Sequence, residues 1–161
     1  MTKRTSNILI ILFAAGLAFA CSRGRNLIYT DTAAMPGAAW SLFDNPDFRI
    51  PVNDTLVRTN VFFSIRTGSA YPFRNIWLFV TATSPDGKSI MTDTVQYDLA
   101  DEKGRWYGSG LGDIHELKLP YRQNVFFPEK GIYHFRIRHG MRIGELKGVY
   151  DIGVRVEKTG K

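Results

Sequence analysis

Cysteine, histidine and long apolar runs are scarce in this 161-residue sequence. The single cysteine, Cys21, cannot form a disulfide within the chain, so packing must stabilise the domain. The three histidines are scattered, and no His-x-His or His-Glu-x-x-His spacing occurs, so the sequence predicts no metal site. The main apolar stretch, from Ile8 to Ala20, is shorter than the roughly 18 residues that a membrane-spanning helix needs.

Helical periodicity is also absent after Cys21, although residues 141–146 could form one helical turn. Short runs that alternate with period two are present instead, separated by turn signals such as Ser84-Pro85-Asp86-Gly87. These expected strands lie within residues 57–66, 76–83, 91–99, 117–127, 131–138 and 150–157. We therefore predict an all-β fold, an antiparallel β-sandwich that is jelly-roll-like, with little helix after the signal peptide.

The alternation also predicts which side chains face the core. Trp77, inside a continuous apolar run, is expected to be buried. Residues 150–157 are expected to bury one set of alternate side chains, namely Tyr150, Ile152, Val154 and Val156. In residues 131–138, Tyr133, Phe135 and Ile137 should face the core, which leaves the intervening basic side chains on the opposite face.

The N-terminus has the features of a secretory signal, with Lys3 and Arg4 followed by the apolar stretch and then Cys21. The residues Ala18-Phe19-Ala20-Cys21 resemble a lipobox, in which a diacylglyceryl group is added to the cysteine sulfur before cleavage on its N-terminal side. Ala18 departs from the aliphatic residue that is usual there. We predict that residues 1–20 are removed and that Cys21 carries a covalent lipid; a single-span anchor is the alternative.

The mature chain is expected to comprise a lipidated N-terminus and tether over residues 21–37 and one β-sandwich domain over residues 38–161. Removing Lys3 and Arg4 lowers the formal net charge from +6 to +4. This excess is too small and too dispersed to indicate nucleic-acid binding. No cofactor other than the lipid on Cys21 is expected.

Several motifs along the mature chain together resemble a known family. They are residues 71–79 (Tyr-Pro-Phe-Arg-Asn-Ile-Trp-Leu-Phe), Asp93-Thr94-Val95, residues 104–110 (Gly-Arg-Trp-Tyr-Gly-Ser-Gly) and Gly140-Met141-Arg142. With the lipoprotein start, they are similar to the GldH family, the gliding-motility lipoproteins of Bacteroidetes. The resemblance implies an accessory envelope protein of the gliding machinery, whose parts overlap with the type IX secretion system. It implies no catalytic residue and no ligand.

Two groups of residues are candidates for binding a partner. Trp106 and Tyr107 lie between glycines in an expected loop, where they could stack on a glycan or cover the end of the sandwich. His134, Arg136 and Arg138, with Arg142 beyond them, form a basic face that could meet an anionic partner or be an ordinary solvated sheet face. We expect a nearby carboxylate to offset this charge, with Asp151 and Glu157 as candidates.

Two other patterns are weaker. Gly108, Gly110 and Gly112 do not open a helix after a buried strand, so they predict a flexible or bulged loop rather than a phosphate site. The carboxylates at 93, 98, 101 and 102 lack the spacing of an EF-hand, which favours solvated turn residues over a calcium site.

The favoured function is a non-enzymatic, membrane-anchored lipoprotein that contacts other envelope proteins of the gliding or secretion apparatus. A glycan-binding lipoprotein is the main alternative, and a glycosidase would need a carboxylate pair that the sequence does not reveal. Cys21 is followed by Ser22, Arg23, Gly24 and Arg25, rather than by the acidic residues associated with surface export in Bacteroidetes. We therefore predict a domain that faces the periplasm.

Overall fold

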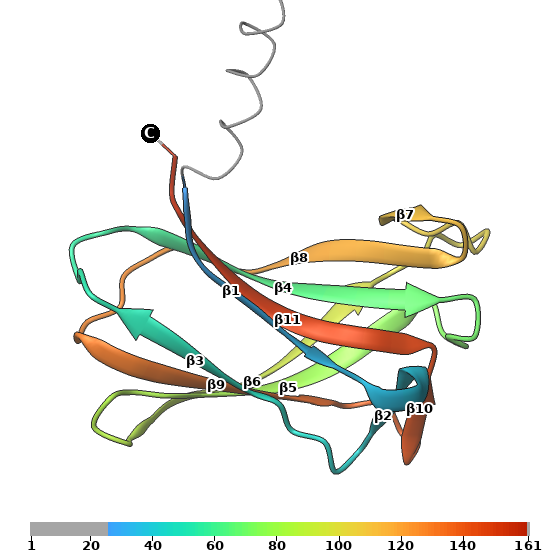
Figure 1. Ribbon diagram of the computed structural model, residues 1–161, viewed down its shortest axis with the longest axis horizontal. Helices are drawn as coiled ribbons and strands as arrows, with labels where there is room; N and C mark the ends of the chain where they lie inside the picture. The colour runs from blue at the N-terminus through green and yellow to red at the C-terminus, as the bar shows by residue number, and fades with distance from the viewer. Residues whose placement is uncertain (1–25, 161) are drawn as a thin grey trace, which may run out of the picture.

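The computed structural model describes residues 26–160, which form two antiparallel sheets packed face to face, with a two-stranded ladder at one end (Figure 1). The larger sheet has the order β1 (Leu27–Ala34), β11 (Val149–Lys158), β4 (Thr59–Gly68), β8 (Ile114–Val125) and β7 (Ser109–Leu111). The smaller sheet has the order β3 (Asp47–Val52), β9 (Gly131–His139), β5 (Asn75–Thr83) and β6 (Ser89–Asp98). The ladder pairs β2 (Ala39–Ser41) with β10 (Glu145–Lys147), next to the 3₁₀ turn η2 (Pro36–Ala38).

The strand pairs nest inside one another along the chain. Strand β5 pairs with β6, β4 with β8, β3 with β9, and β1 with β11, so each outer pair encloses the inner ones. Distributed over two sheets, this nesting is the eight-stranded jelly roll. The predicted fold class is confirmed, and β2, β7 and β10 are short additions to it.

One hydrophobic core fills the space between the sheets. Alternate residues of the central strands point inward and are almost fully buried, among them Phe63 and Ile65 of β4, Leu78 of β5, and Tyr133 and Ile137 of β9. Full burial of such side chains contributes about 1.5–3 kcal/mol each to folding. The inward faces predicted for residues 61–65, 117–121 and 133–137 are therefore confirmed, as is the β5–β6 hairpin.

Three details of the strands differ from the prediction. Residues 27–34, expected within the tether, form edge strand β1, which covers β11. Its side chains are mostly exposed, so the strand carries little apolar alternation. Residues 141–146 form no helical turn; the chain bends there and enters β10. Tyr150 is exposed because the register of β11 against β4 shifts between Val149 and Asp151.

Trp77 was predicted to be buried, but 39% of its surface is exposed. Strand β5 is apolar on both faces, and Ile76, Leu78 and Val80 take the inward positions. The alternation of the strand therefore leaves Trp77 and Phe79 on the outer face of the smaller sheet.

Both ends of the described chain meet at one end of the sandwich, where the N–H of Lys158 donates to the carbonyl of Asn26 (2.7 Å). The predicted signal peptide, residues 1–20, and Cys21 lie outside the described residues. Within residues 26–160, no helix has the length and apolar character needed to cross a membrane.

Candidate docking surface

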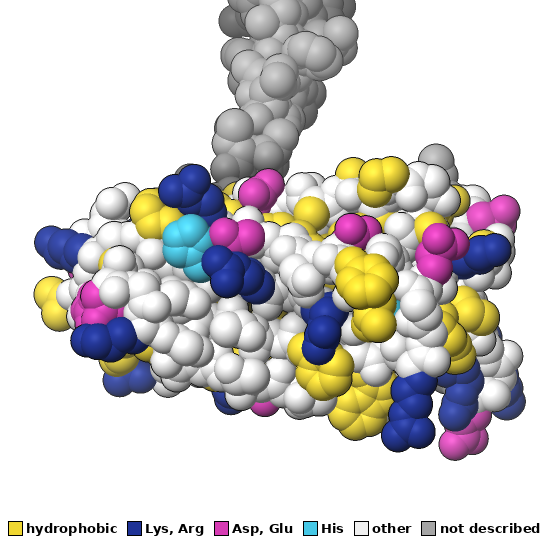
Figure 2. Space-filling view, turned by 90° about the horizontal axis from the view of Figure 1, so that it is seen from below, with side chains coloured by type: hydrophobic (Ala, Val, Ile, Leu, Met, Phe, Trp, Pro, Cys, Tyr) yellow, Lys and Arg dark blue, Asp and Glu magenta, His cyan; other side chains and the backbone are white. Residues whose placement is uncertain are grey.

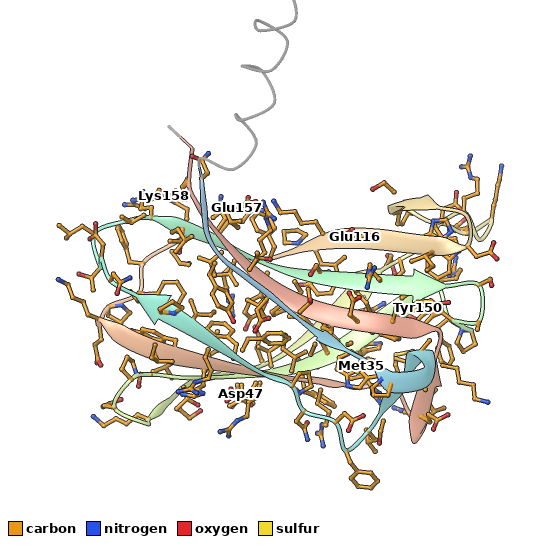
Figure 3. All side chains as sticks on the ribbon, in the orientation of Figure 1. Met35, Asp47, Glu116, Tyr150, Glu157 and Lys158 are labelled. Carbon is orange, nitrogen blue, oxygen red and sulfur yellow. The ribbon has the colours of Figure 1, made fainter. Side chains whose placement is uncertain are left out.

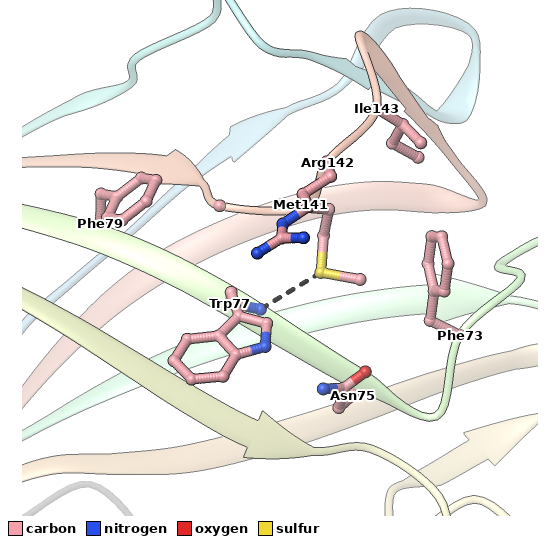
Figure 4. Close-up of a pocket in the computed structure, with 8 residues that line it drawn as sticks. Phe73, Asn75, Trp77, Phe79, Met141, Arg142 and Ile143 are labelled. Atoms are coloured by element: carbon pink, nitrogen blue, oxygen red, sulfur yellow. Dashed lines mark hydrogen bonds between the residues drawn. The ribbon is translucent and has the colours of Figure 1, made fainter.

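An open groove of about 580 Å³ lies on the outer face of the smaller sheet, where β5 meets the chain leaving β9 (Figure 4). Aromatic, apolar, amide and arginine side chains line it, and the set is Phe73, Asn75, Trp77, Phe79, Gly140, Met141, Arg142 and Ile143. The lining contains no serine, cysteine, histidine or carboxylate, so it offers neither a nucleophile nor a general base. The groove is suited to binding rather than to acid–base or nucleophilic chemistry.

Local backbone contacts fix the shape of the groove. The N–H of Gly140 donates to the carbonyl of Trp77 (2.6 Å), and the Trp77 N–H donates to the sulfur of Met141 (3.4 Å; Figure 4). A Cβ at Gly140 would lie 3.0 Å from the Phe79 ring and 3.2 Å from Trp77 Cβ. A glycine at position 140 therefore lets the chain after β9 run directly against the two aromatic residues.

Arginines give the groove a positive edge. The guanidinium of Arg138 lies over the ring of Phe79, 5.1 Å from its centroid, and Arg142 is exposed on the groove wall. Neither arginine has an ion-pair partner among the described residues. Figure 2, which views the molecule from below, shows hydrophobic side chains beside Lys and Arg on this face. The surface therefore combines apolar area with unneutralised positive charge.

The other two basic residues of β9 lie beside a carboxylate, Asp47 of β3. His134 Nδ1 lies 2.8 Å from Asp47 Oδ2, and Arg136 Nε lies 3.9 Å from Asp47 Oδ1. The expectation that Asp151 or Glu157 would offset the basic face was wrong, because both belong to the opposite sheet. Asp151 pairs with Arg66, and Glu157 pairs with Lys118 and Arg155.

Trp106 and Tyr107 are separate from the groove and differ from each other. The indole of Trp106 stacks on His115, with ring centroids 5.3 Å apart and planes 13° apart, and it contacts Tyr71 edge-on. One face of this indole is therefore covered by an imidazole. Tyr107 is 63% exposed beside β7, with no aromatic partner among the described residues.

The glycine and carboxylate patterns of residues 93–112 form a short strand, a turn and surface ion pairs. Residues 109–111 form the short edge strand β7 rather than a flexible loop, and Gly112, with φ +64°, turns the chain into β8. Asp93 pairs with Arg122 and Asp101 with Arg105, each at 2.7 Å. Residues 26–160 contain no cluster of three or more His, Cys, Asp and Glu that could hold a metal ion.

A fully buried histidine, His139, directly precedes Gly140 of the groove. His139 ends β9, and its ring meets Trp40 edge-on at 5.4 Å. Both residues are fully buried, and neither ring nitrogen of His139 has a hydrogen-bond partner within the described chain. Burial lowers the pKa of His139 below its usual value of 6.5, which favours the neutral imidazole.

The sequence analysis identified Arg138 and Arg142 as possible binding residues. It did not identify Phe73, Trp77 and Phe79, the aromatic residues that line the groove. The available signal was residues 71–79, an unbroken aromatic-rich segment in which both faces of a strand are apolar. A strand of a two-layer sandwich has only one face in the core, so such a segment must expose apolar side chains on the other.

A jelly-roll sandwich that follows a lipobox-like sequence is the arrangement expected of an envelope lipoprotein. Residues 27–156 match the sequence model of the family described as GldH lipoprotein, and the chain belongs to this family, which is membrane-anchored in the cell envelope. The resemblance inferred from the sequence motifs is thereby confirmed.

Two relatives match over nearly their whole lengths. The gliding motility lipoprotein GldH of Flavobacterium johnsoniae is 34% identical over 162 residues, which cover 96% of this chain and 98% of that protein. The gliding motility lipoprotein GldH homolog of Christiangramia forsetii is 31% identical over 160 residues, with 95% and 96% covered. The VP2 subviral particle of infectious bursal disease virus aligns with a TM-score of 0.38 and 16% identity, over 84% of this chain and 33% of VP2. That similarity is too low to indicate a shared function.

Proposed function

We propose that this protein is an accessory lipoprotein of the gliding-motility and type IX secretion apparatus, and that its groove binds another protein of that apparatus. The names of the two relatives support the setting. The groove carries the binding role, because it combines exposed aromatic side chains with exposed arginine on one face of the sandwich. No catalytic activity is part of the proposal.

The chemistry of the groove specifies its partner. Trp77, Phe79 and Phe73 offer apolar area, so the partner presents an apolar side chain to them. Arg138 and Arg142 stand at the edge without an ion-pair partner among the described residues, so the partner segment also carries carboxylates. An acidic segment with an aromatic or aliphatic anchor meets both requirements.

The lipid on Cys21 holds the domain at a membrane and raises the concentration at which it meets membrane-bound partners. We propose that the domain faces the periplasm, because Arg23 and Arg25 follow the lipidated cysteine. Protease added to intact cells should then spare the domain, whereas protease added after outer-membrane permeabilisation should digest it. Rapid digestion in intact cells would place the domain on the cell surface.

The test of partner binding is crosslinking in living cells, followed by isolation of the protein and identification of what is attached. We expect Trp77→Ala and Arg142→Glu to remove the same protein adduct while the protein level stays normal. Phe43→Ala and Arg49→Glu are matched controls, because both residues are exposed and neither lines the groove. An unchanged set of adducts in both groove variants would reject the groove as the docking surface.

A glycan is the second candidate ligand for the same groove. The partly exposed indole of Trp77 lies beside the Asn75 side chain (Figure 4), and the two offer a planar ring for stacking and an amide for hydrogen bonding to a sugar. Calorimetry with envelope polysaccharides separates the two candidates. Saturable sugar binding that disappears in Trp77→Ala would favour the glycan, and loss only in Trp106→Ala would point to the β7 end instead.

A further inference from the structure

The end of the sandwich that carries the N-terminus also gathers three loops, at residues 53–58, 84–88 and 126–130. The Thr159 N–H donates to the carbonyl of Arg58 (2.9 Å), which joins the first loop to the C-terminal end of β11. A Cβ at Gly131 would lie 2.7 Å from Pro85, so the other two loops are in contact as well. In Figure 3, Lys158 marks this end, next to the start of β1.

Exposed apolar side chains collect on these loops. Leu56 is 84% exposed, and Phe126 is 45% exposed with the Arg58 guanidinium 4.6 Å from its ring centroid. Leu27 and Ile28, the first residues of β1, are also exposed. Side chains of this kind on adjacent loops are typical of a surface that meets a protein or a membrane.

Charged residues surround the apolar ones. The cations on these loops and at the end of β11 are Arg58, Lys88, Lys130 and Lys158, and the anions are Asp54, Asp86, Glu129 and Glu157. Lys88 pairs with Asp86 at 2.6 Å, and Glu157 pairs with Lys118 and Arg155, so the charged residues of this set without an ion-pair partner within residues 26–160 are three cations and two anions. The sequence between Cys21 and Asn26 adds Arg23 and Arg25 and no acidic residue. This distribution suits an anionic lipid surface.

The length of the tether decides which partner this end meets. Five peptide steps separate Cys21 from Asn26, and even a fully extended chain of five residues spans only about 17 Å. A domain held that closely cannot move its anchored end far from the bilayer. The apolar loops at that end therefore stay within reach of lipid, whereas a protein would have to enter a narrow gap to reach them.

We propose that this end of the sandwich docks on the membrane that holds the lipid anchor, with Leu56 and Phe126 in the bilayer interface and Arg58 and Lys158 at the headgroups. The proposal rests on the acylation of Cys21 given under the proposed function. It fixes the orientation of the domain and directs the groove, which lies toward the other end of β5, away from the bilayer and toward partners. Two anchoring signals, a lipid and a surface contact, also hold a protein on a membrane more firmly than one.

The small cavity at this end does not offer the acyl chain a place instead. It measures about 150 Å³ and is lined by Ile28, Val57, Phe127, Val156 and neighbouring residues. An apolar protein cavity of about 150 Å³ accommodates a molecule the size of benzene. The acyl chains are much longer, so they stay in the bilayer.

The test uses the full mature, acylated protein in vesicles of phosphatidylethanolamine and phosphatidylglycerol whose acyl chains are brominated, since bromine quenches tryptophan on contact. Leu56→Trp places a reporter on the proposed surface, and Phe126→Trp is a second reporter there. Phe43→Trp is the matched control, because Phe43 is 87% exposed on the loop before β3, at the opposite end. Mass spectrometry and vesicle flotation establish first that each variant is acylated and bound.

We expect vesicle binding to blue-shift the added fluorescence of Leu56→Trp and Phe126→Trp, and brominated lipid to quench it, with neither effect on Phe43→Trp. Acylated, floating protein with no quenching of either reporter would overturn the docking while leaving the anchor intact, and would point to a protein as the occupant of this end. Equal quenching in all three variants would also overturn it, because the domain would then have no fixed orientation. Protein that neither carries a lipid nor floats would instead refute the anchor on which the proposal rests.

Discussion

The ion pair between Arg66 and Asp151 provides a test of how the larger sheet is stabilised. Both Nε and a terminal nitrogen of Arg66 contact Oδ2 of Asp151, and this pairing raises the pKa of the arginine. The two side chains differ in exposure, at 50% for Arg66 and 7% for Asp151. Removing one partner should therefore have a different effect from removing the other.

The expected loss of stability in each variant depends on which charged side chain remains without its partner. Arg66→Ala leaves a buried carboxylate without its partner, which in a fully buried pair costs about 3–5 kcal/mol. Because Arg66 is half exposed, water can enter the space that its side chain leaves and partly solvate the Asp151 carboxylate. We therefore expect Arg66→Ala to lower the free energy of unfolding by about 2–3 kcal/mol. Asp151→Ala leaves an arginine that can reach solvent and that lies opposite Glu116, so we expect a loss of about 1 kcal/mol.

Urea denaturation monitored by tryptophan fluorescence measures these losses as changes in the free energy of unfolding. The double variant Arg66→Ala/Asp151→Ala should lose about 1–2 kcal/mol less than the sum of the two single variants, because the two residues interact. Equal losses in the single variants, or a larger loss in Asp151→Ala, would refute the reasoning from exposure. Additive losses would show that the contact contributes no stability.

Three further predictions concern separate features. Burial of His139 lowers its pKa, so the unfolded chain binds a proton that the folded chain does not. The free energy of unfolding should then fall as the pH drops below about 6.5, by at most about 1.4 kcal/mol per pH unit, and His139→Leu should show a shallower fall in urea titrations at several pH values. Gly148→Ala should lower the melting temperature, because Gly148 has φ +78° and a Cβ there would lie 2.2 Å from the backbone nitrogen of Tyr71. A melting temperature within a degree or so of wild type would contradict this. Cys21→Ser should abolish incorporation of labelled fatty acid, and continued labelling would refute the lipobox.

The sequence predicted the jelly roll well where one face of a strand is apolar and the other polar. Strand β9 is the clearest case, because Tyr133, Phe135 and Ile137 alternate with three basic residues and leave one possible orientation. The same reasoning failed for β5, where Trp77 and Phe79 are as apolar as their inward neighbours. Alternation carries no information about direction when both faces are apolar.

The errors at other positions come from features that depend on distant parts of the chain. Asp47 contacts His134, 87 residues away in the sequence, and only the pairing of β3 with β9 brings the two together. The exposure of Tyr150 depends on a register shift against β4, which shifts the inward positions of β11. Strand β1 was missed because an edge strand with exposed side chains has no core-facing pattern, although its backbone completes the sheet.

Site-specific photo-crosslinking in living cells tests the account of the docking surface most directly. A photoreactive phenylalanine analogue at Phe79 probes the groove, and the same analogue at Leu56 probes the anchored end of the domain. We predict a discrete protein adduct from position 79, reduced by Arg142→Glu, and lipid adducts from position 56. A protein adduct from position 56 and none from position 79 would contradict the account, and would show that the domain binds its partner through the opposite end.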